Sequence, residues 1–201
     1  MNWERKGRIY SPPKNVYAQV PTPIIFEKTI RIFFSSRRHG KNSSLPKSFI
    51  SFIDLDKKNP SKIVHVNNNQ ILEFGDKGEF DEFGLMPGDI LKVNPNTHYL
   101  YYTGWTRCKS IPYSTSIGLA ISNDNCKTFK KSFNGPILSK NKFDPLLVNG
   151  PSITKKGNLF YMFYSSAKKW VEHKNQNEVY YFIKYATSKN GIDWKTNNYY
   201  P

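Results

Sequence analysis

The sequence predicts an all-β protein organised as part of a β-propeller, and three observations lead to this prediction. Residues that favour strands are abundant: aromatic side chains make up 15% of the chain, and they fit the pleated surface of a sheet. No segment keeps a helical period, and 13 prolines would interrupt one. Finally, an aromatic, strand-like segment occurs in three copies along the chain.

The repeated segment reads IRIFFSS at 30–36, YLYYTGW at 99–105 and LFYMFYS at 159–165. With Phe33, Tyr101 and Tyr161 as equivalents, the copies are about 68 and 60 residues apart, which is typical of propellers or arrays. Such a unit cannot bury both faces of its own sheet, so neighbouring units must pack side by side. A propeller gathers its loops around one central pocket, and function is expected there.

The first unit, or blade, is predicted over residues 19–70, after a leading strand and loop in residues 1–18. Isoleucine, phenylalanine and valine recur in short runs that are separated by polar turns, as in neighbouring strands. The strands of this unit are expected at 21–26, 30–35, 49–54 and 63–66.

The second unit is predicted over residues 85–140 and follows a loop with four glycines between 75 and 88. Its strands are expected at 89–93, 98–104, 117–122 and 129–132. The third unit is predicted over residues 148–197 and opens after Asp144-Pro145, with a turn at 189–191 before Trp194. Its strands are expected at 151–154, 159–165 and 180–188.

The whole chain, residues 1–201, is predicted to form one incomplete propeller domain. Three units cannot close a ring, because propellers typically carry four to eight blades. Either the chain is a fragment of a longer protein or it closes by self-association, and truncation is the favoured expectation.

The turn after the third strand of unit 2 fits an Asp-box, Ser-x-Asp-x-Gly-x-Thr-aromatic. It runs from Ser122 to Phe129, with Cys126 at the usual glycine, and residues 188–194 form a shorter version. Asp or Asn side chains in such turns accept hydrogen bonds from backbone amides. The motif is therefore interpreted as structural, away from any pocket.

The chain carries a formal net charge of +15, which raises the possibility of an anionic partner such as nucleic acid, acidic glycan or a membrane surface. Many lysines stand in pairs in turns spread along the chain, and no nucleic-acid motif accompanies them. A general compositional bias explains the charge better, so neither nucleic acid nor a membrane is expected as a partner.

The chain has two cysteines, Cys108 and Cys126, and neither a signal peptide nor a long apolar run is recognisable. Both are expected to be free thiols in a cytoplasmic protein. The four histidines are scattered, with no zinc-binding spacing. No metal and no cofactor is expected.

Several segments, taken in order, resemble a group of bacterial glycosyl hydrolase-like proteins. They are Trp3 with Gly7-Arg8-Ile9-Tyr10, 21–23 (PTP), 31–37 (RIFFSSR), 78–84 (GEFDEFG), 101–105 (YYTGW), 117–122 (IGLAIS) and 183–186 (IKYA). That group is related to the five-bladed propellers of glycoside hydrolase families 43, 32, 68 and 130, and its members are linked with surface-polysaccharide biosynthesis. The resemblance covers essentially the whole chain and implies a five-bladed fold of which the chain supplies part.

Glycoside hydrolysis usually needs two carboxyl groups, one acting as an acid and the other as a nucleophile or base. In the related propellers these acids lie on the innermost strands or just before them. Asp81, in the glycine-flanked loop, is the best match and is the predicted catalytic residue. The alternative is that Asp81, Glu79 and Glu82 cap turns and pair with lysines. Asp144 is a weaker candidate, because an Asp-Pro turn explains it as well.

Three further residues are predicted to bind substrate. Arg37 follows the strand at 30–35, where a guanidinium could hold a carboxylate, phosphate or sugar hydroxyl by two parallel bonds. Trp105 and Trp170 follow the middle strands of their units and could stack on sugar rings, or else fill the contact between units. His173 is a weaker candidate.

The leading hypothesis is a glycoside hydrolase-like protein that acts on or binds a sugar or an activated sugar such as a sugar nucleotide. Whether it is an enzyme is left open, because the inner strands at 21–23 and 149–153 carry no acid where families 43 and 32 have one. The alternative is a non-catalytic glycan-binding or scaffold propeller. A nucleic-acid-binding protein is the third reading, and steep salt dependence would be its signature.

Overall fold

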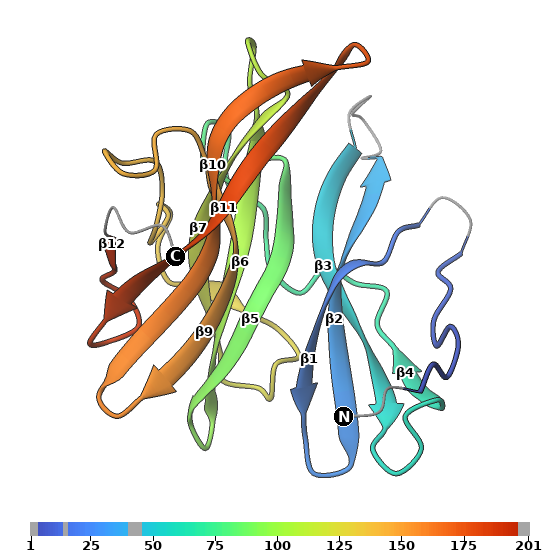
Figure 1. The fold of residues 1–201 in the computed structure, drawn as a ribbon. Coiled ribbons are helices and arrows are strands. Elements are labelled where there is room, and N and C mark those ends of the chain that lie inside the picture. The colour runs from blue at the N-terminus through green and yellow to red at the C-terminus, as the bar shows by residue number, and fades with distance from the viewer. Residues whose placement is uncertain (1–3, 14–15, 40–45, 197–201) are drawn as a thin grey trace.

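The computed structural model describes residues 4–13, 16–39 and 46–196. Every regular element within these residues is a β-strand, which confirms the predicted all-β class (Figure 1). None of the described residues forms a helix that could cross a membrane. The strands are β1 (Gln19–Ile25), β2 (Thr29–His39), β3 (Pro46–Asp56), β4 (Ile63–Val66), β5 (Gly84–Asn94), β6 (Thr97–Arg107), β7 (Tyr113–Ser122), β8 (Lys130–Lys131), β9 (Val148–Lys156), β10 (Leu159–His173), β11 (Gln176–Ser188) and β12 (Lys195–Thr196).

The strands form three antiparallel four-stranded units, β1–β4, β5–β8 and β9–β12, in which each strand pairs with the next along the chain. Units 1 and 2 are joined by a single parallel bridge between Ser48 of β3 and Gly84 of β5. This arrangement agrees with the predicted partial propeller. The pattern arises because each aromatic strand is long enough to pair with a neighbour on either side.

The first strands of the units lie next to one another, as the inner strands of a propeller do. The Thr22 hydroxyl of β1 donates to the carbonyl of Gly88 in β5 at 3.3 Å, and the amide of Ile153 in β9 donates to the Asp89 carboxylate at 2.6 Å. Polar contacts thus link each inner strand to the next one, and the later strands of each unit lie further out.

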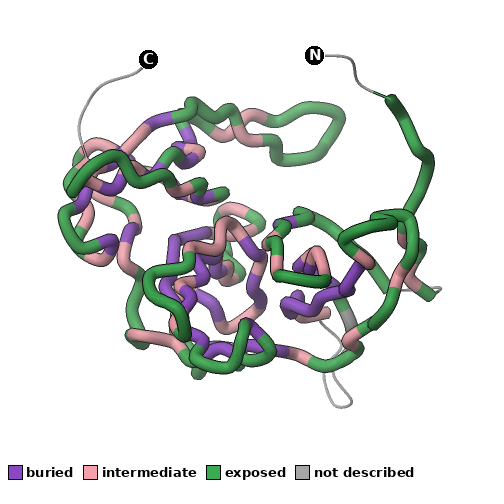
Figure 2. The backbone as a smooth tube through the Cα atoms, turned by 90° about the horizontal axis from the view of Figure 1, so that it is seen from below, coloured by how far each residue is buried: buried purple, intermediate pink, exposed green. Residues whose placement is uncertain are grey.

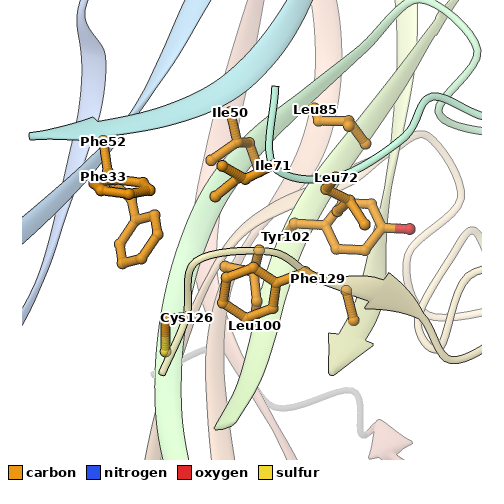
Figure 3. Close-up of a cluster of buried hydrophobic side chains, with 11 residues drawn as sticks. Phe33, Ile50, Phe52, Ile71, Leu72, Leu85, Leu100, Tyr102, Cys126 and Phe129 are labelled. Atoms are coloured by element: carbon orange, nitrogen blue, oxygen red, sulfur yellow. The ribbon is translucent and has the colours of Figure 1, made fainter. Parts of the chain in front are cut away.

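The hydrophobic core lies between the units because the middle strands are buried on both faces. In β6, Leu100 and Tyr102 pack against Phe33 and Ile50 of unit 1 (Figure 3). The intervening Tyr101 packs against unit 3, in a second cluster with Met162 and Tyr164 of β10. Figure 2 shows the buried residues inside the units and the exposed ones along their outer loops. Alternating side chains on one strand therefore hold two interfaces.

The Asp-box is a structural turn, as its sequence predicts. The Asp124 carboxylate accepts hydrogen bonds from the amides of Lys127 and Thr128, both at 3.0 Å, and the Cys126 amide donates to the Ser122 hydroxyl at 2.9 Å. Burial raises the pKa of Asp124, but these and neighbouring hydrogen bonds outweigh burial and hold the pKa below its usual value. Cys126 takes the glycine-like backbone conformation, with φ of 60°.

Several strand ends that were predicted from the sequence are wrong. The leading strand expected in residues 1–18 is absent from the described part of that segment. Pro12 and Pro13 lack amides for a ladder, and the Val16 amide donates to the Pro13 carbonyl at 3.0 Å. The strands β10 and β11 extend well beyond 159–165 and 180–188, forming the long hairpin that projects at the upper end of Figure 1.

Both cysteines are free thiols, with Cys126 buried and Cys108 exposed.

Candidate functional site

The strand register gathers side chains from units 1 and 2 at one end of the sheets. Arg37 near the end of β2 is opposite Ser48 of β3, and Trp105 near the end of β6 is opposite Gly84 of β5. The bridge between Ser48 and Gly84 joins these two pairs. Arg37 and Trp105, both predicted from the sequence to bind substrate, therefore lie at the two ends of one row of paired residues that crosses four strands.

A cluster of cations and aromatic rings occupies this end, and we call it the rim cluster: Arg37, Lys47, Phe83, Trp105 and Arg107. The guanidinium carbon of Arg37 lies 5.8 Å from the centre of the Trp105 ring, and that of Arg107 lies 5.7 Å from it. The ring of Phe83 packs against Trp105 with centroids 6.1 Å apart. Arg107 and Lys47 also lie near Phe83, at 5.3 and 5.6 Å from its centre.

Gly84 allows this close approach. A Cβ atom at position 84 would collide with Nε1 of Trp105 and would lie 2.9 Å from Cβ of Ser48. The glycine therefore lets the indole lie against the start of β5, in the gap between the two units. Arg37 and Arg107 are exposed, whereas Lys47, Phe83 and Trp105 are half-buried, so the cluster presents both charge and ring surface to solvent.

Asp81, the predicted catalytic residue, is fully buried. Its carboxylate pairs with the Lys131 ammonium at 2.7 Å and accepts a hydrogen bond from the Tyr102 hydroxyl at 2.9 Å. Burial, together with the charge of Asp81, raises the pKa of Tyr102, which therefore stays protonated and donates. Gly104 leaves room for the acid, since a Cβ there would collide with Cβ of Asp81.

The acids beside Asp81 are also engaged. Glu79 accepts a hydrogen bond from the Asp76 amide at 3.0 Å and lies 3.6 Å from Lys131, and Glu82 accepts one from the Gly78 amide at 2.9 Å. This is the arrangement that the structural alternative described, with turn caps and a lysine pair. The catalytic role of Asp81 stays a prediction, and its surroundings favour a structural role.

Unit 3 repeats the buried acid of unit 2. Asp144 precedes β9 as Asp81 precedes β5, and its carboxylate accepts from Ser166 at 2.6 Å, the Lys184 ammonium at 2.9 Å and the Tyr164 hydroxyl at 3.1 Å. Burial raises the pKa of Asp144, but the hydrogen bonds from Ser166, Lys184 and Asn141 and the charge of Lys184 outweigh burial and lower it. Asp81 and Asp144 thus belong to separate ion pairs of the same kind.

Trp170 lies apart from Arg37 and Trp105, in a second group of side chains between units 2 and 3. Its ring meets Tyr113 edge-on, with centroids 5.3 Å apart, and the Tyr113 and Tyr181 hydroxyls are 3.5 Å apart. Trp170 was expected after a middle strand that ends at 165, but it lies within the longer β10. Arg107 is paired with Tyr113 in the ladder between β6 and β7, so this group adjoins the rim cluster. His173 is exposed at the end of β10.

Sequence reasoning missed Lys47, Phe83 and Arg107. Arg107 could have been found, because it stands two residues after Trp105 and residues two apart on a strand share a face. Lys47 and Phe83 carry no such signal, since their position depends on the bridge between units 1 and 2. Across the described parts of the chain, no three His, Cys, Asp or Glu side chains gather closely enough to hold a metal ion.

Comparison with known proteins places the fold but not the activity. No protein-family model matches the chain. Two curated relatives, uncharacterized proteins MT1551 and Rv1502 from two strains of Mycobacterium tuberculosis, are 31% identical over 201 residues, which is 97% of this chain and 64% of each relative. The chain therefore spans less than two thirds of the length of these relatives.

Among solved structures, the chain is similar to glycoside hydrolases. A GH32 β-fructofuranosidase of Bombyx mori matches over 94% of this chain and 38% of its own, with a TM-score of 0.65 and 11% identity. A family 117 glycoside hydrolase of Zobellia galactanivorans matches over 94% and 48%, with a TM-score of 0.61 and 15% identity. A putative glycosidase of Bacteroides thetaiotaomicron matches over 94% and 57%, with 0.65 and 16%. The chain thus has a glycoside-hydrolase-like, all-β propeller fold.

Proposed function

We propose that this protein binds carbohydrate and that the rim cluster is its ligand site. The observation that carries the proposal is the Arg37 guanidinium over the Trp105 ring, 5.8 Å from its centre, at the end of the sheets where units 1 and 2 meet. An aromatic face beside a fixed hydrogen-bond donor suits a sugar, whose ring has an apolar C–H face and hydroxyls at its edge.

The positions of the donor groups support the proposal. Nε of Arg37 donates to the Ser48 hydroxyl at 3.3 Å, which holds one edge of the guanidinium against β3 and does not use its two terminal nitrogens. Within the described residues these nitrogens make no hydrogen bond to the protein. A preorganised donor loses little side-chain entropy when a ligand arrives.

The proposal is tested by calorimetric titration with a panel of oligosaccharides. Trp105→Ala and Arg37→Ala should each weaken binding of a recognised oligosaccharide about tenfold or more, a loss of about 1.4 kcal/mol. Lys155→Ala and Phe163→Ala are matched controls, because they remove an exposed cation and an exposed aromatic ring outside the rim cluster. Absence of binding to every oligosaccharide, or equal losses in the control variants, would contradict the proposal.

Glycoside cleavage is the second candidate function. It is favoured by the likeness to glycoside hydrolases in fold and by the position of Asp81 against Gly104, the residue before Trp105 on β6. Cleavage would require Asp81 to leave its pair with Lys131 and a second acid to join it. We therefore favour binding without cleavage for the described residues. A role in surface-polysaccharide metabolism, sugar-nucleotide ligands and a cytoplasmic location stay predictions.

A further inference from the structure

The rim cluster contains three cations and no acid. Arg37, Lys47 and Arg107 all lie within 6 Å of the Phe83 or Trp105 ring centres. Across residues 4–13, 16–39 and 46–196, none of the three forms an ion pair with a carboxylate. Glu82, which directly precedes Phe83, accepts from the Gly78 amide instead. The positive charge of this surface is therefore not neutralised by neighbouring described residues.

Aromatic rings hold these cations in place. The Lys47 ammonium lies 5.0 Å from the centre of Phe74 and 5.6 Å from that of Phe83, and it is half-buried. Arg107 lies near both Phe83 and Trp105. Cation–π contacts are favourable but leave the donors of the guanidinium and ammonium groups free for a ligand.

Gathering like charges has a free-energy cost, which an anionic ligand removes. Elsewhere in the chain, buried cations are matched with acids: Arg31 pairs with Asp54 at 2.7 Å, and Lys184 with Asp144 at 2.9 Å. In the rim cluster, Arg37 and Arg107 are exposed and Lys47 is half-buried, and these three cations lie together on one surface beside partly accessible aromatic rings. Two guanidinium groups on one indole can donate hydrogen bonds to the oxygens of one carboxylate or phosphate group.

Resting on the proposed carbohydrate binding, we infer that the ligand of the rim cluster is an anionic sugar. Its ring lies against Trp105, and its carboxylate or phosphate group is held by Arg37 and Arg107, with Lys47 adding to the positive field. The shared chemistry is a sugar that carries an oxyanion, either the carboxylate of a uronic acid or the phosphate of a glycosyl phosphate.

The test compares three sugar probes by calorimetry: a neutral hexasaccharide, a hexuronic-acid hexasaccharide and a hexose 1-phosphate. At least one acidic probe should bind about tenfold or more tightly than the neutral one, and which of the two binds identifies the source of the oxyanion. Raising the salt from about 50 to about 500 mM should weaken this binding, because exposed charges are screened. The neutral probe should respond little.

The variant Arg37→Gln/Arg107→Gln removes both charges but keeps polar side chains, and it should reduce the preference for the acidic probe to about threefold or less. Lys155→Gln is the matched control and should keep the preference; thermal melts verify that each variant is folded. The salt series needs no variant and tests the inference independently.

The outcomes separate the two proposals. Equal affinity for neutral and acidic probes, with losses in Trp105→Ala, would overturn the anionic ligand and leave carbohydrate binding standing. Failure of all three sugars would overturn both. A single-stranded DNA oligonucleotide that binds more tightly than the acidic sugars, and that depends on Arg37 and Arg107, would replace the inference with a nucleic-acid site.

Discussion

The pair formed by Asp81 and Lys131 permits a direct test of whether Asp81 serves stability. In Asp81→Asn the neutral amide keeps a hydrogen-bond acceptor for Tyr102, but the Lys131 ammonium, only 14% exposed, loses its carboxylate at 2.7 Å and keeps only the more distant Glu79 at 3.6 Å. Breaking a buried pair by removal of one partner costs about 3–5 kcal/mol. The retained hydrogen bond to Tyr102 places the expected loss near the lower end, at about 3 kcal/mol.

For a chain of this length, a loss of about 3 kcal/mol lowers the melting temperature by about 6–12 °C. Thermal unfolding followed by circular dichroism measures this shift, and urea unfolding measures the free energy directly. Glu178→Gln is the control, because it makes the same change of charge at an exposed position of β11 and should leave the melting temperature nearly unchanged.

The double variant Asp81→Asn/Lys131→Met separates the pair from either residue alone. Because it removes both charges, it should be more stable than Asp81→Asn, and the difference measures the cost of an ammonium that has lost Asp81 and keeps only Glu79 at 3.6 Å. An unchanged melting temperature in Asp81→Asn, together with loss of glycoside turnover, would refute a stabilising role for Asp81 and favour a catalytic one.

Three further results are expected. Asp144→Asn should lower the free energy of unfolding at pH 7 and make it depend less on pH in acid, because the folded pKa of Asp144 lies below 3.8 and its stabilisation is lost as pH falls through that folded value. Urea titrations at several acidic pH values measure this dependence, and the same dependence in the variant and the parent protein would contradict the prediction. Gly104→Ala should destabilise by about 2 kcal/mol or more through overpacking, since a Cβ would collide with the buried acid, whereas Gly135→Ala, with open space around it, should not. In native protein, mass spectrometry should find iodoacetamide on exposed Cys108 alone, because burial raises the pKa of Cys126 to about 12; labelling of both would indicate an open turn.

The fold could be predicted largely from local signals. The alternation of aromatic residues in the three repeated segments predicts β2, β6 and β10, because the period of two on a strand is independent of distant contacts. The ends of β10 and β11 could not be predicted. Lys168, Lys169 and residues 172–178 are polar and resemble a loop, but a hairpin that projects into solvent can be polar on both faces.

The site could be predicted only in part. Arg37 and Trp105 were predicted because each follows the aromatic strand of its unit, and the structure brings them together. The environment of Asp81 was not predictable, because Lys131 is 50 residues away in sequence and reaches it from the outermost strand of the unit. A glycine-flanked acid has the same sequence pattern whether it faces a substrate or a buried ammonium.

The duplicated acid also bears on how the repeats diverged. The partner of Asp144 is Lys184 on the third strand of its unit, opposite Tyr164; the corresponding residue opposite Tyr102 is Gly118, and the ammonium comes instead from Lys131 on the fourth strand. The two units therefore neutralise a buried acid with a lysine from different strands. In homologous chains, loss of a lysine at one of these places should be accompanied by gain at the other, or by loss of the acid itself.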